Sequence, residues 1–297
     1  MGAHQGMAEA GRDVVAPMVL EAWDVFLAQA ESVELDRPSR LPGWRAREIC
    51  VHLGCWDDHA ALHDLVTSAR SGGTGTPPDP DAVNARVVAA HRDASREEVL
   101  AGLRRNRDAT ARYLADEPVA LDTAPAVSVV GRLPLLSVVL GQAYELAVHG
   151  LDLVSCGAEP PPASVLQSGL AALTDVTGAL AASSGIPGRV SLVTPDGGWG
   201  FTSAGGGWQV RRVPAGVVEG PAVEAAADLL LDAASGRVNP VPAAARRRLK
   251  VHDVPGLLQL APIVQQVPGI PGGPILQLAA RTVGGAGGVL GRLFGRG

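Results

Sequence analysis

Residues 133–154 read LPLLSVVLGQAYELAVHGLDLV, and this stretch decides how the first half of the chain is interpreted. We predict a helix over the whole of it. Glu145 and His149 stand four residues apart, so their side chains share one helix face, with Cβ atoms about 5–6 Å apart. This pair presents an oxygen and a nitrogen donor. One imidazole from a facing helix would complete a three-ligand metal site with open positions, the arrangement that catalytic zinc sites use.

Histidines upstream of this stretch are candidates for the third ligand. A helix predicted from about Arg45 to Ala69 carries His52, Trp56, His59 and His63 on one face. His52 and His59 would lie about 10 Å apart along the axis, so both cannot bind one ion. Spacing leaves open which of them is the ligand, and whether His59 and His63 form a separate site. A buried Glu–His hydrogen bond and a solvated polar stripe are the alternatives to a metal site.

Further helices around these two indicate a helical bundle, whose interior suits inward-pointing ligands. Apolar residues at helical spacing predict a helix over about Val14–Glu34. Another is expected over Ala82–His91. A capping box at Ser95–Glu98 begins a helix that runs to about Ala115.

The second half of the chain has a different pattern. Prolines 160–162 mark the expected domain boundary, and a helix is predicted from Ala163 to Ser184. Three alternating segments separated by Gly-rich turns then predict antiparallel strands at 189–194, 198–203 and 208–213, followed by a helix over 223–234. The expected fold class is α + (α+β): a helical bundle at residues 10–160, a small α+β domain at 161–242 and a Gly/Pro-rich C-terminal extension at 243–297.

Composition excludes several classes of protein. The 297 residues are 46% hydrophobic with a net charge of −5, which argues against disorder and against nucleic-acid binding. Three cysteines without a CxxC motif cannot build a disulfide framework. With no signal peptide or membrane-spanning run recognised in the sequence, we expect a cytoplasmic protein. The sequence indicates no oligomeric state.

The stretch SRLPGWRAREICVHL, residues 39–53, resembles the entry to the second helix in the mycothiol-dependent maleylpyruvate isomerase family of the DinB-like superfamily. Residues 145–152 resemble the family's second pair of metal ligands. The whole resemblance covers about residues 14–155. The resemblance implies that His52, Glu145 and His149 bind a divalent metal, most plausibly zinc. The resemblance also includes Asp152, which lies one turn beyond His149. Asp152 could orient that imidazole by a hydrogen bond or be an ordinary helix-end charge. Residues 186–238 resemble the family's C-terminal domain, which is related to sterol-carrier folds.

The resemblance also implies a chemistry. The thiol of mycothiol, activated by the metal, would add to the double bond of maleylpyruvate, and rotation and elimination would give fumarylpyruvate. Arg237 is the expected cation for the anionic substrate, although an arginine that complements a helix dipole is an equal interpretation. A mycothiol S-transferase acting in detoxification and a non-catalytic metal- or lipid-binding protein are the alternative functions.

Other residues near these motifs are assigned structural roles. Cys50 and Cys55 are interpreted as small buried apolar residues rather than nucleophiles. Trp44 and Trp56 are expected to pack the bundle near the site. Residues 283–294 of the extension are expected to pack over the body of the protein or to be partly mobile, in preference to contacting a membrane surface.

Overall fold

The computed structural model describes residues 4–260 and residue 262. They form two compact units, one of residues 5–172 and one of His4 with the described residues from Leu173 onward. The boundary predicted at prolines 160–162 lies in the loop before helix α8 (Ala163–Ser183), and the two units divide within that helix. The structure mixes helices and strands, as the sequence predicts for the chain as a whole.

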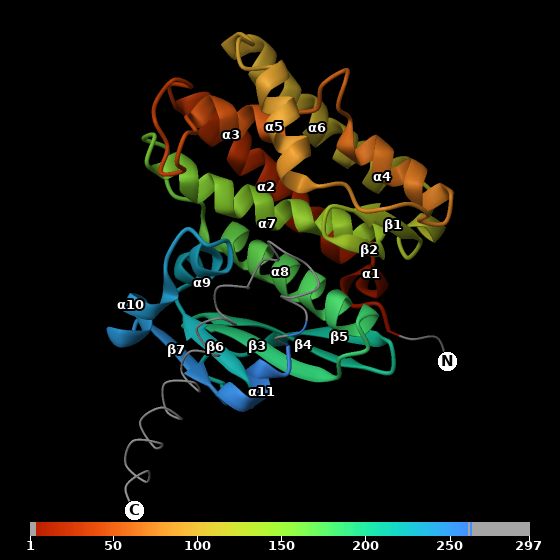
Figure 1. Cartoon of the computed structure of the whole chain (residues 1–297), viewed down its shortest axis with the longest axis vertical. Coiled ribbons are helices and arrows are strands. Elements are labelled where there is room, and N and C mark those ends of the chain that lie inside the picture. The colour runs from red at the N-terminus through yellow and green to blue at the C-terminus, as the bar shows by residue number, and fades with distance from the viewer. Residues whose placement is uncertain (1–3, 261, 263–297) are drawn as a thin grey trace, which may run out of the picture. The chain divides into compact units, whose positions relative to one another are not determined.

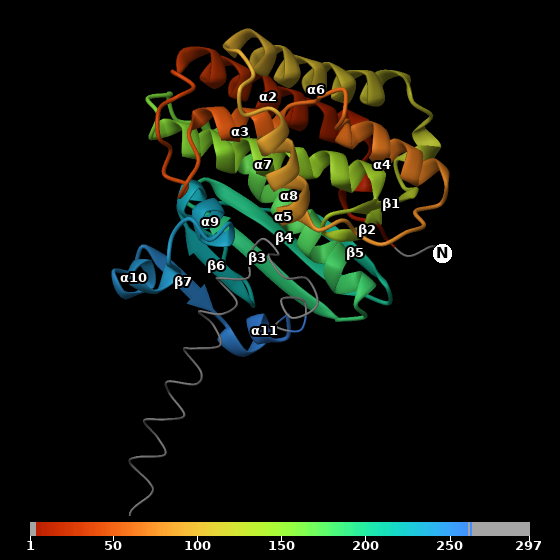
Figure 2. The ribbon, with the colours of Figure 1, turned by 45° about the horizontal axis from the view of Figure 1, so that its top comes forward.

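The N-terminal unit is mainly helical, and its longest helices lie side by side (Figures 1 and 2). Four helices predicted from sequence, those beginning near residues 14, 82, 95 and 133, are confirmed to within two residues at each end. The helices are α1 (Met7–Ala10), α2 (Arg12–Ser32), α3 (Ala46–Leu53), α4 (Ala61–Arg70), α5 (Pro80–Ala90), α6 (Arg96–Asp116) and α7 (Leu135–Val154), with a short 3-10 turn at Val119–Leu121.

Packing between α2 and α7 fixes the helix that carries Glu145 and His149. Val15, Val19, Trp23 and Phe26 are buried along one stripe of α2, at the three- and four-residue spacing of a core-facing helix. The Trp23 indole N–H donates to Oε1 of Gln142 on α7 at 2.6 Å, which satisfies the one polar group of that ring. This bond and the apolar stripe together set the position of α7 relative to α2.

The prediction of one continuous helix over residues 45–69 is wrong, because α3 ends at Leu53 and α4 begins at Ala61. The Trp56 side chain folds back over Gly54, where a Cβ would lie 2.8 Å from its Nε1, and donates to the Val51 carbonyl at 2.9 Å. Asn106 of α6 donates to the Leu53 carbonyl at 2.8 Å. The last carbonyls of α3 therefore find side-chain partners, and these tertiary contacts end the helix.

A short hairpin that the sequence analysis missed connects α6 to α7. Strands β1 (Pro125–Ser128) and β2 (Gly131–Pro134) pair antiparallel. Val127 N–H donates to the Ser68 hydroxyl of α4 at 3.0 Å, so the hairpin also ties α4 to the start of α7.

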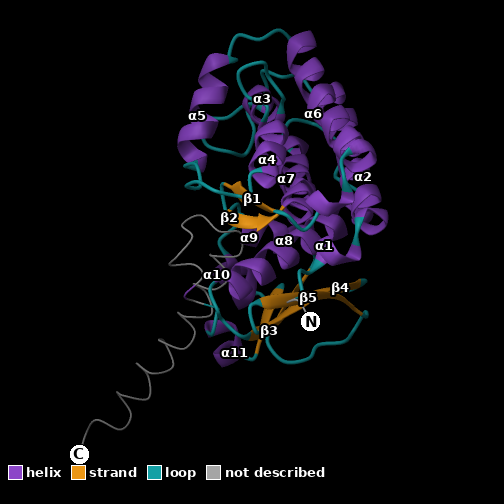
Figure 3. Ribbon diagram, turned by 90° about the vertical axis from the view of Figure 1, so that its right-hand side faces the viewer, coloured by secondary structure: helices purple, strands orange, loops and turns teal. Residues whose placement is uncertain are grey.

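The C-terminal unit contains a five-stranded sheet in the order β5-β4-β3-β6-β7, whose strands are labelled in Figure 1. Figure 3 shows β3, β4 and β5 of this sheet from the side. Strands β3, β4 and β5 form an antiparallel meander, β6 is parallel to β3, and β7 is antiparallel to β6. The three predicted strands are confirmed. The elements are β3 (Gly188–Thr194), β4 (Gly197–Ala204), β5 (Gly207–Val213), β6 (Ala222–Ala225), α9 (Ala227–Ala234), α10 (Pro240–Ala245), β7 (Leu249–His252) and α11 (Val254–Leu258).

Strand β6 occupies the start of the stretch predicted as a helix at residues 223–234, and only α9 is helical there. Ala222–Ala225 bonds to β3 on one side and β7 on the other, and these ladder partners override the helical preference of its alanines. Residues 243–258 belong by prediction to the extension, yet they contain the second half of α10, the edge strand β7 and α11. The segment 283–294 lies outside the described residues.

Helix α8 is the one described helix that is long and apolar enough to span a membrane, by length and composition alone. In the fold, 83% of its most apolar window is buried. The apolar character of α8 is therefore that of a core helix.

Replacing Gly178 of α8 by alanine tests how closely this helix approaches the sheet. A Cβ there would lie 2.7 Å from Cδ1 of Trp208 and 3.1 Å from Cβ of Phe201. Overpacking costs about 1–3 kcal/mol, which outweighs the helix preference for alanine of about 1 kcal/mol. We expect Gly178→Ala to lower the free energy of unfolding in urea.

Gly141 of α7 provides the matched control, since no atom lies within 4 Å of a Cβ built there. Gly141→Ala should raise the free energy of unfolding by up to about 1 kcal/mol. Stabilisation by both substitutions would contradict the close approach.

Candidate metal centre

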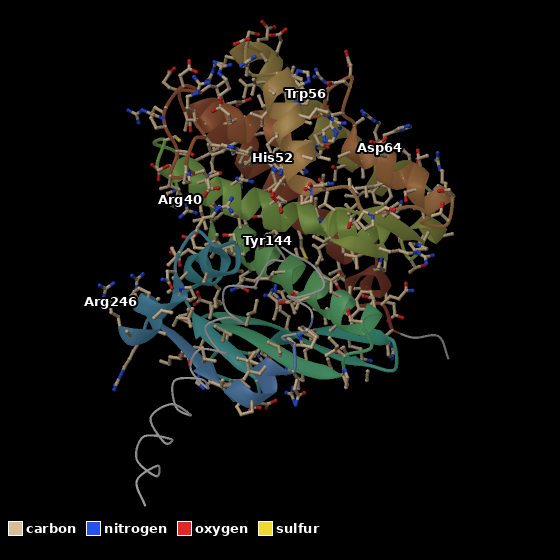
Figure 4. All side chains as sticks on the ribbon, in the orientation of Figure 1. Arg40, His52, Trp56, Asp64, Tyr144 and Arg246 are labelled. Carbon is tan, nitrogen blue, oxygen red and sulfur yellow. The ribbon has the colours of Figure 1, made fainter. Side chains whose placement is uncertain are left out.

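His52 reaches the centre from the last turn of α3. A capping box fixes the start of this helix, because Arg45 N–H donates to Glu48 Oε2 at 2.7 Å while the Arg45 side chain returns to the Glu48 carboxylate. The His52 side chain is 17% exposed, and its place is labelled in Figure 4.

Glu145 and His149 meet His52 from the facing helix α7. Glu145 Oε2 lies 3.9 Å from His52 Nε2 and 3.7 Å from His149 Nε2. The two imidazole centroids are 5.2 Å apart. His149 is buried whereas the Glu145 side chain is 48% exposed. One side of the ligand group therefore lies in the core and the other side faces solvent.

A buried carboxylate orients His149. Its Nδ1 lies 2.9 Å from Asp152 Oδ2, and Asp152 is completely buried. Desolvation by burial lowers the pKa of His149, while this hydrogen bond acts in the opposite direction. A neutral His149 that donates from Nδ1 leaves its Nε2 lone pair facing Glu145 and His52. The orienting role considered for Asp152 is therefore supported by its contact with the imidazole.

Arg40 contacts the Asp152 carboxylate. This residue was not assigned a role from the sequence. Its Nε donates to Asp152 Oδ1 at 2.7 Å, across 112 positions of sequence. The position of Arg40 near the end of α7 is visible in Figure 4. Only the fold brings the two residues together.

Trp44 lies against both imidazoles, as expected from sequence. Its ring is parallel to that of His149 at 6.3 Å between centroids and tilted to that of His52 at 5.6 Å. Trp56 instead stacks on His91 at 3.9 Å, and His91 Nε2 lies 2.8 Å from the Asp58 carboxylate. Trp44 therefore forms a wall of the centre, and Trp56 stabilises the turn that follows α3.

The shared helix face predicted for the four upstream residues does not exist, because the break after Leu53 separates them. His59 pairs with Trp56 in an isolated bridge within the turn, and His63 is exposed on α4. Burial lowers the pKa of His59. Among the described residues, the group whose donor atoms all lie within 4.8 Å of one another is His52, Glu145 and His149.

These three side chains fit a divalent metal by donor type and by distance. Zinc binds imidazole nitrogen and carboxylate oxygen at about 2.0–2.2 Å, which places tetrahedral ligand atoms about 3.3–3.6 Å apart. The separations of 3.7 and 3.9 Å are a few tenths of an ångström wider, within the reach of small side-chain rotations. Three protein ligands and a solvent-facing side leave coordination positions open.

Arg237, the predicted cation, follows α9 in the C-terminal unit, and its Nη1 donates to the Ser235 carbonyl at 3.1 Å. Its role toward substrate stays a prediction.

The helical fold and this His/Glu/His group define a class of protein: a helical domain whose facing helices bring together three side chains that could hold a metal ion. Comparison with known proteins gives a family match. Residues 18–154 match the family described as mycothiol maleylpyruvate isomerase N-terminal domain. The resemblance drawn from the sequence is confirmed over these residues.

Two solved structures share the fold over most of the chain. The crystal structure of the mycothiol-dependent maleylpyruvate isomerase is 17% identical with a TM-score of 0.50, covering 76% of this chain and 90% of that one. The structure of its H52A mutant, in that protein's own numbering, is 16% identical with the same coverage and TM-score. At this identity the similarity shows the fold alone. No curated protein sequence matches the chain.

Removing either imidazole should abolish tight metal binding. We expect wild-type protein to bind one divalent ion, and His52→Ala and His149→Ala to lose more than the roughly 10–100-fold in affinity that an outer contact contributes. Metal content of the purified protein and competition with a chromophoric chelator measure this. His63→Ala is the control, because that exposed imidazole lies on another helix and should leave affinity unchanged. Full metal content in both folded ligand variants would contradict the assignment.

Proposed function

We propose that this chain is a metal- and mycothiol-dependent enzyme of the maleylpyruvate isomerase type. The observation that carries the proposal is the meeting of His52, Glu145 and His149 within a domain of that family. The family supports an isomerase. The identity of the metal, the identity of the substrate and the order of the chemical steps are part of the proposal.

His52, Glu145 and His149 would hold the ion, and their two imidazoles and one carboxylate suit zinc best. A divalent metal bound there supplies charge that keeps a coordinating thiol in its thiolate form at neutral pH. Asp152 fixes the tautomer of His149, and Trp44 shields one side of the imidazoles from water. The half-exposed Glu145 marks the side from which small molecules can enter.

The nucleophilic thiol has to come from outside the chain. Cys50 is fully buried, and burial raises the pKa of its thiol to about 12. Burial also raises the pKa of the Cys55 and Cys156 thiols. Thiols in that state are poor nucleophiles. The family name includes mycothiol, and the thiol of mycothiol would be the external nucleophile.

Isomerisation of maleylpyruvate requires its double bond to become a single bond, rotate and form again. The chain's contribution would be to bind the dicarboxylate and stabilise the negative charge that develops next to its carbonyl group. We retain Arg237 as the proposed cation for that charge.

The finer architecture is proposed on the same basis. We propose a DinB-like bundle for residues 10–160, a sterol-carrier-like domain for 161–242 and an extension for 243–297. The sheet and the helices packed against it support the α+β character of the second domain. Three free cysteines support the proposed cytoplasmic location.

An activity assay with the cysteines removed one at a time tests the proposal. Wild-type protein loaded with zinc should convert maleylpyruvate to fumarylpyruvate only when mycothiol is added. Cys55→Ala should retain this activity, because the attacking thiol is external, whereas His52→Ala should lose it.

Two outcomes would change the assignment. Formation of a mycothiol adduct with an electrophile, without isomerisation, would make the protein an S-transferase. Metal binding without either reaction would make it a binding protein.

A further inference from the structure

The loop that connects α2 to α3, residues 33–45, is hydrogen-bonded to the C-terminal end of α7 and the residues that follow it. Arg40 N–H donates to the Ser155 hydroxyl at 3.0 Å, and its Nε donates to Asp152 Oδ1 at 2.7 Å. Arg37 Nη1 donates to the Cys156 carbonyl at 3.2 Å. The loop thus holds the residues that directly follow His149.

The same loop leads into the helix of the other imidazole. The Ser39 hydroxyl donates to the Trp44 carbonyl at 2.7 Å, which closes the loop, and Arg45 caps α3, on which His52 stands. The loop therefore joins the two elements that present the metal ligands.

We propose that Arg40 is a positioning residue for the metal centre: its guanidinium holds the Asp152 carboxylate in the orientation that fixes His149. This inference rests on the proposed function, since it assigns a role toward the same metal site. Arg40 acts on His149 through Asp152, to which its Nε donates.

Burial makes Asp152 dependent on this contact. The Asp152 side chain is 0% exposed, and a carboxylate out of water needs a paired charge and filled hydrogen bonds. Arg40 is 30% exposed and brings that charge from the surface to Oδ1, while Oδ2 accepts from His149. Without the guanidinium, the carboxylate loses the charged contact that holds Oδ1. The Nε2 lone pair of His149 then no longer points consistently at the other two ligands.

Metal affinity is the readout that separates positioning from general stability. Arg40→Gln should weaken Co²⁺ and Zn²⁺ binding by about 10–100-fold, the usual cost of losing an outer contact to a metal-bound histidine. It should also change the visible absorption of bound Co²⁺, which reports ligand geometry. Arg40→Lys should recover part of the affinity, because lysine restores the charge without the planar fork.

Arg37→Gln is the matched control, since it removes an arginine of the same loop that bonds a backbone carbonyl instead of Asp152. It should leave metal affinity and the Co²⁺ spectrum close to wild type. Thermal unfolding of the metal-free proteins shows whether each variant is folded.

A double-mutant cycle tests the route through Asp152. If Arg40 acts through that carboxylate, Arg40→Gln should add little to the loss caused by Asp152→Asn. Wild-type affinity and spectrum in folded Arg40→Gln, or fully additive losses, would overturn the inference while leaving the proposed function intact. Absence of metal binding by the wild-type protein would overturn both.

Discussion

The hydrogen bond between His149 Nδ1 and the buried Asp152 carboxylate is the contact on which the centre depends. It determines which imidazole nitrogen faces Glu145 and His52, and it keeps a charged group inside the protein, where every unfilled bond is costly. The surrounding structure accordingly supplies a guanidinium to the second carboxylate oxygen. The ligand geometry is thus set by contacts outside the ligands themselves.

Contacts of α2 with the C-terminal part of α7 also restrain the residues that form this hydrogen bond. Gln29 of α2 donates to the carbonyls of Gly150 and Glu159, at 3.3 and 2.6 Å. A Cβ on Gly150 would lie 2.7 Å from Gln29 Oε1 and 2.9 Å from Pro161 Cγ, so a larger residue next to His149 would displace the side chains of Gln29 or Pro161. His149 therefore sits on a turn restrained from two sides, by α2 and by the loop carrying Arg40.

Local features of the chain were predictable from sequence, and contacts between distant residues were not. The Glu145/His149 pair follows from helical spacing alone, and α7 forms where expected. His52 could be selected only through the family resemblance, since spacing left His59 open. The end of α3 at Leu53 was missed because Trp56 and Asn106 supply partners to its last carbonyls only after folding. Arg40 was missed for the same reason.

The split between α3 and α4 also bears on how the centre can work. A continuous helix over residues 45–69 would have placed His59 and His63 in register with His52 and offered competing imidazoles along one face. Because the chain turns after Leu53, His63 stands exposed on a separate helix and His59 lies in the connecting turn. The described ligand group keeps three donors and an open side next to Glu145. That opening leaves room for an external thiol, which the chain's own cysteines, with thiol pKa values raised by desolvation, do not replace.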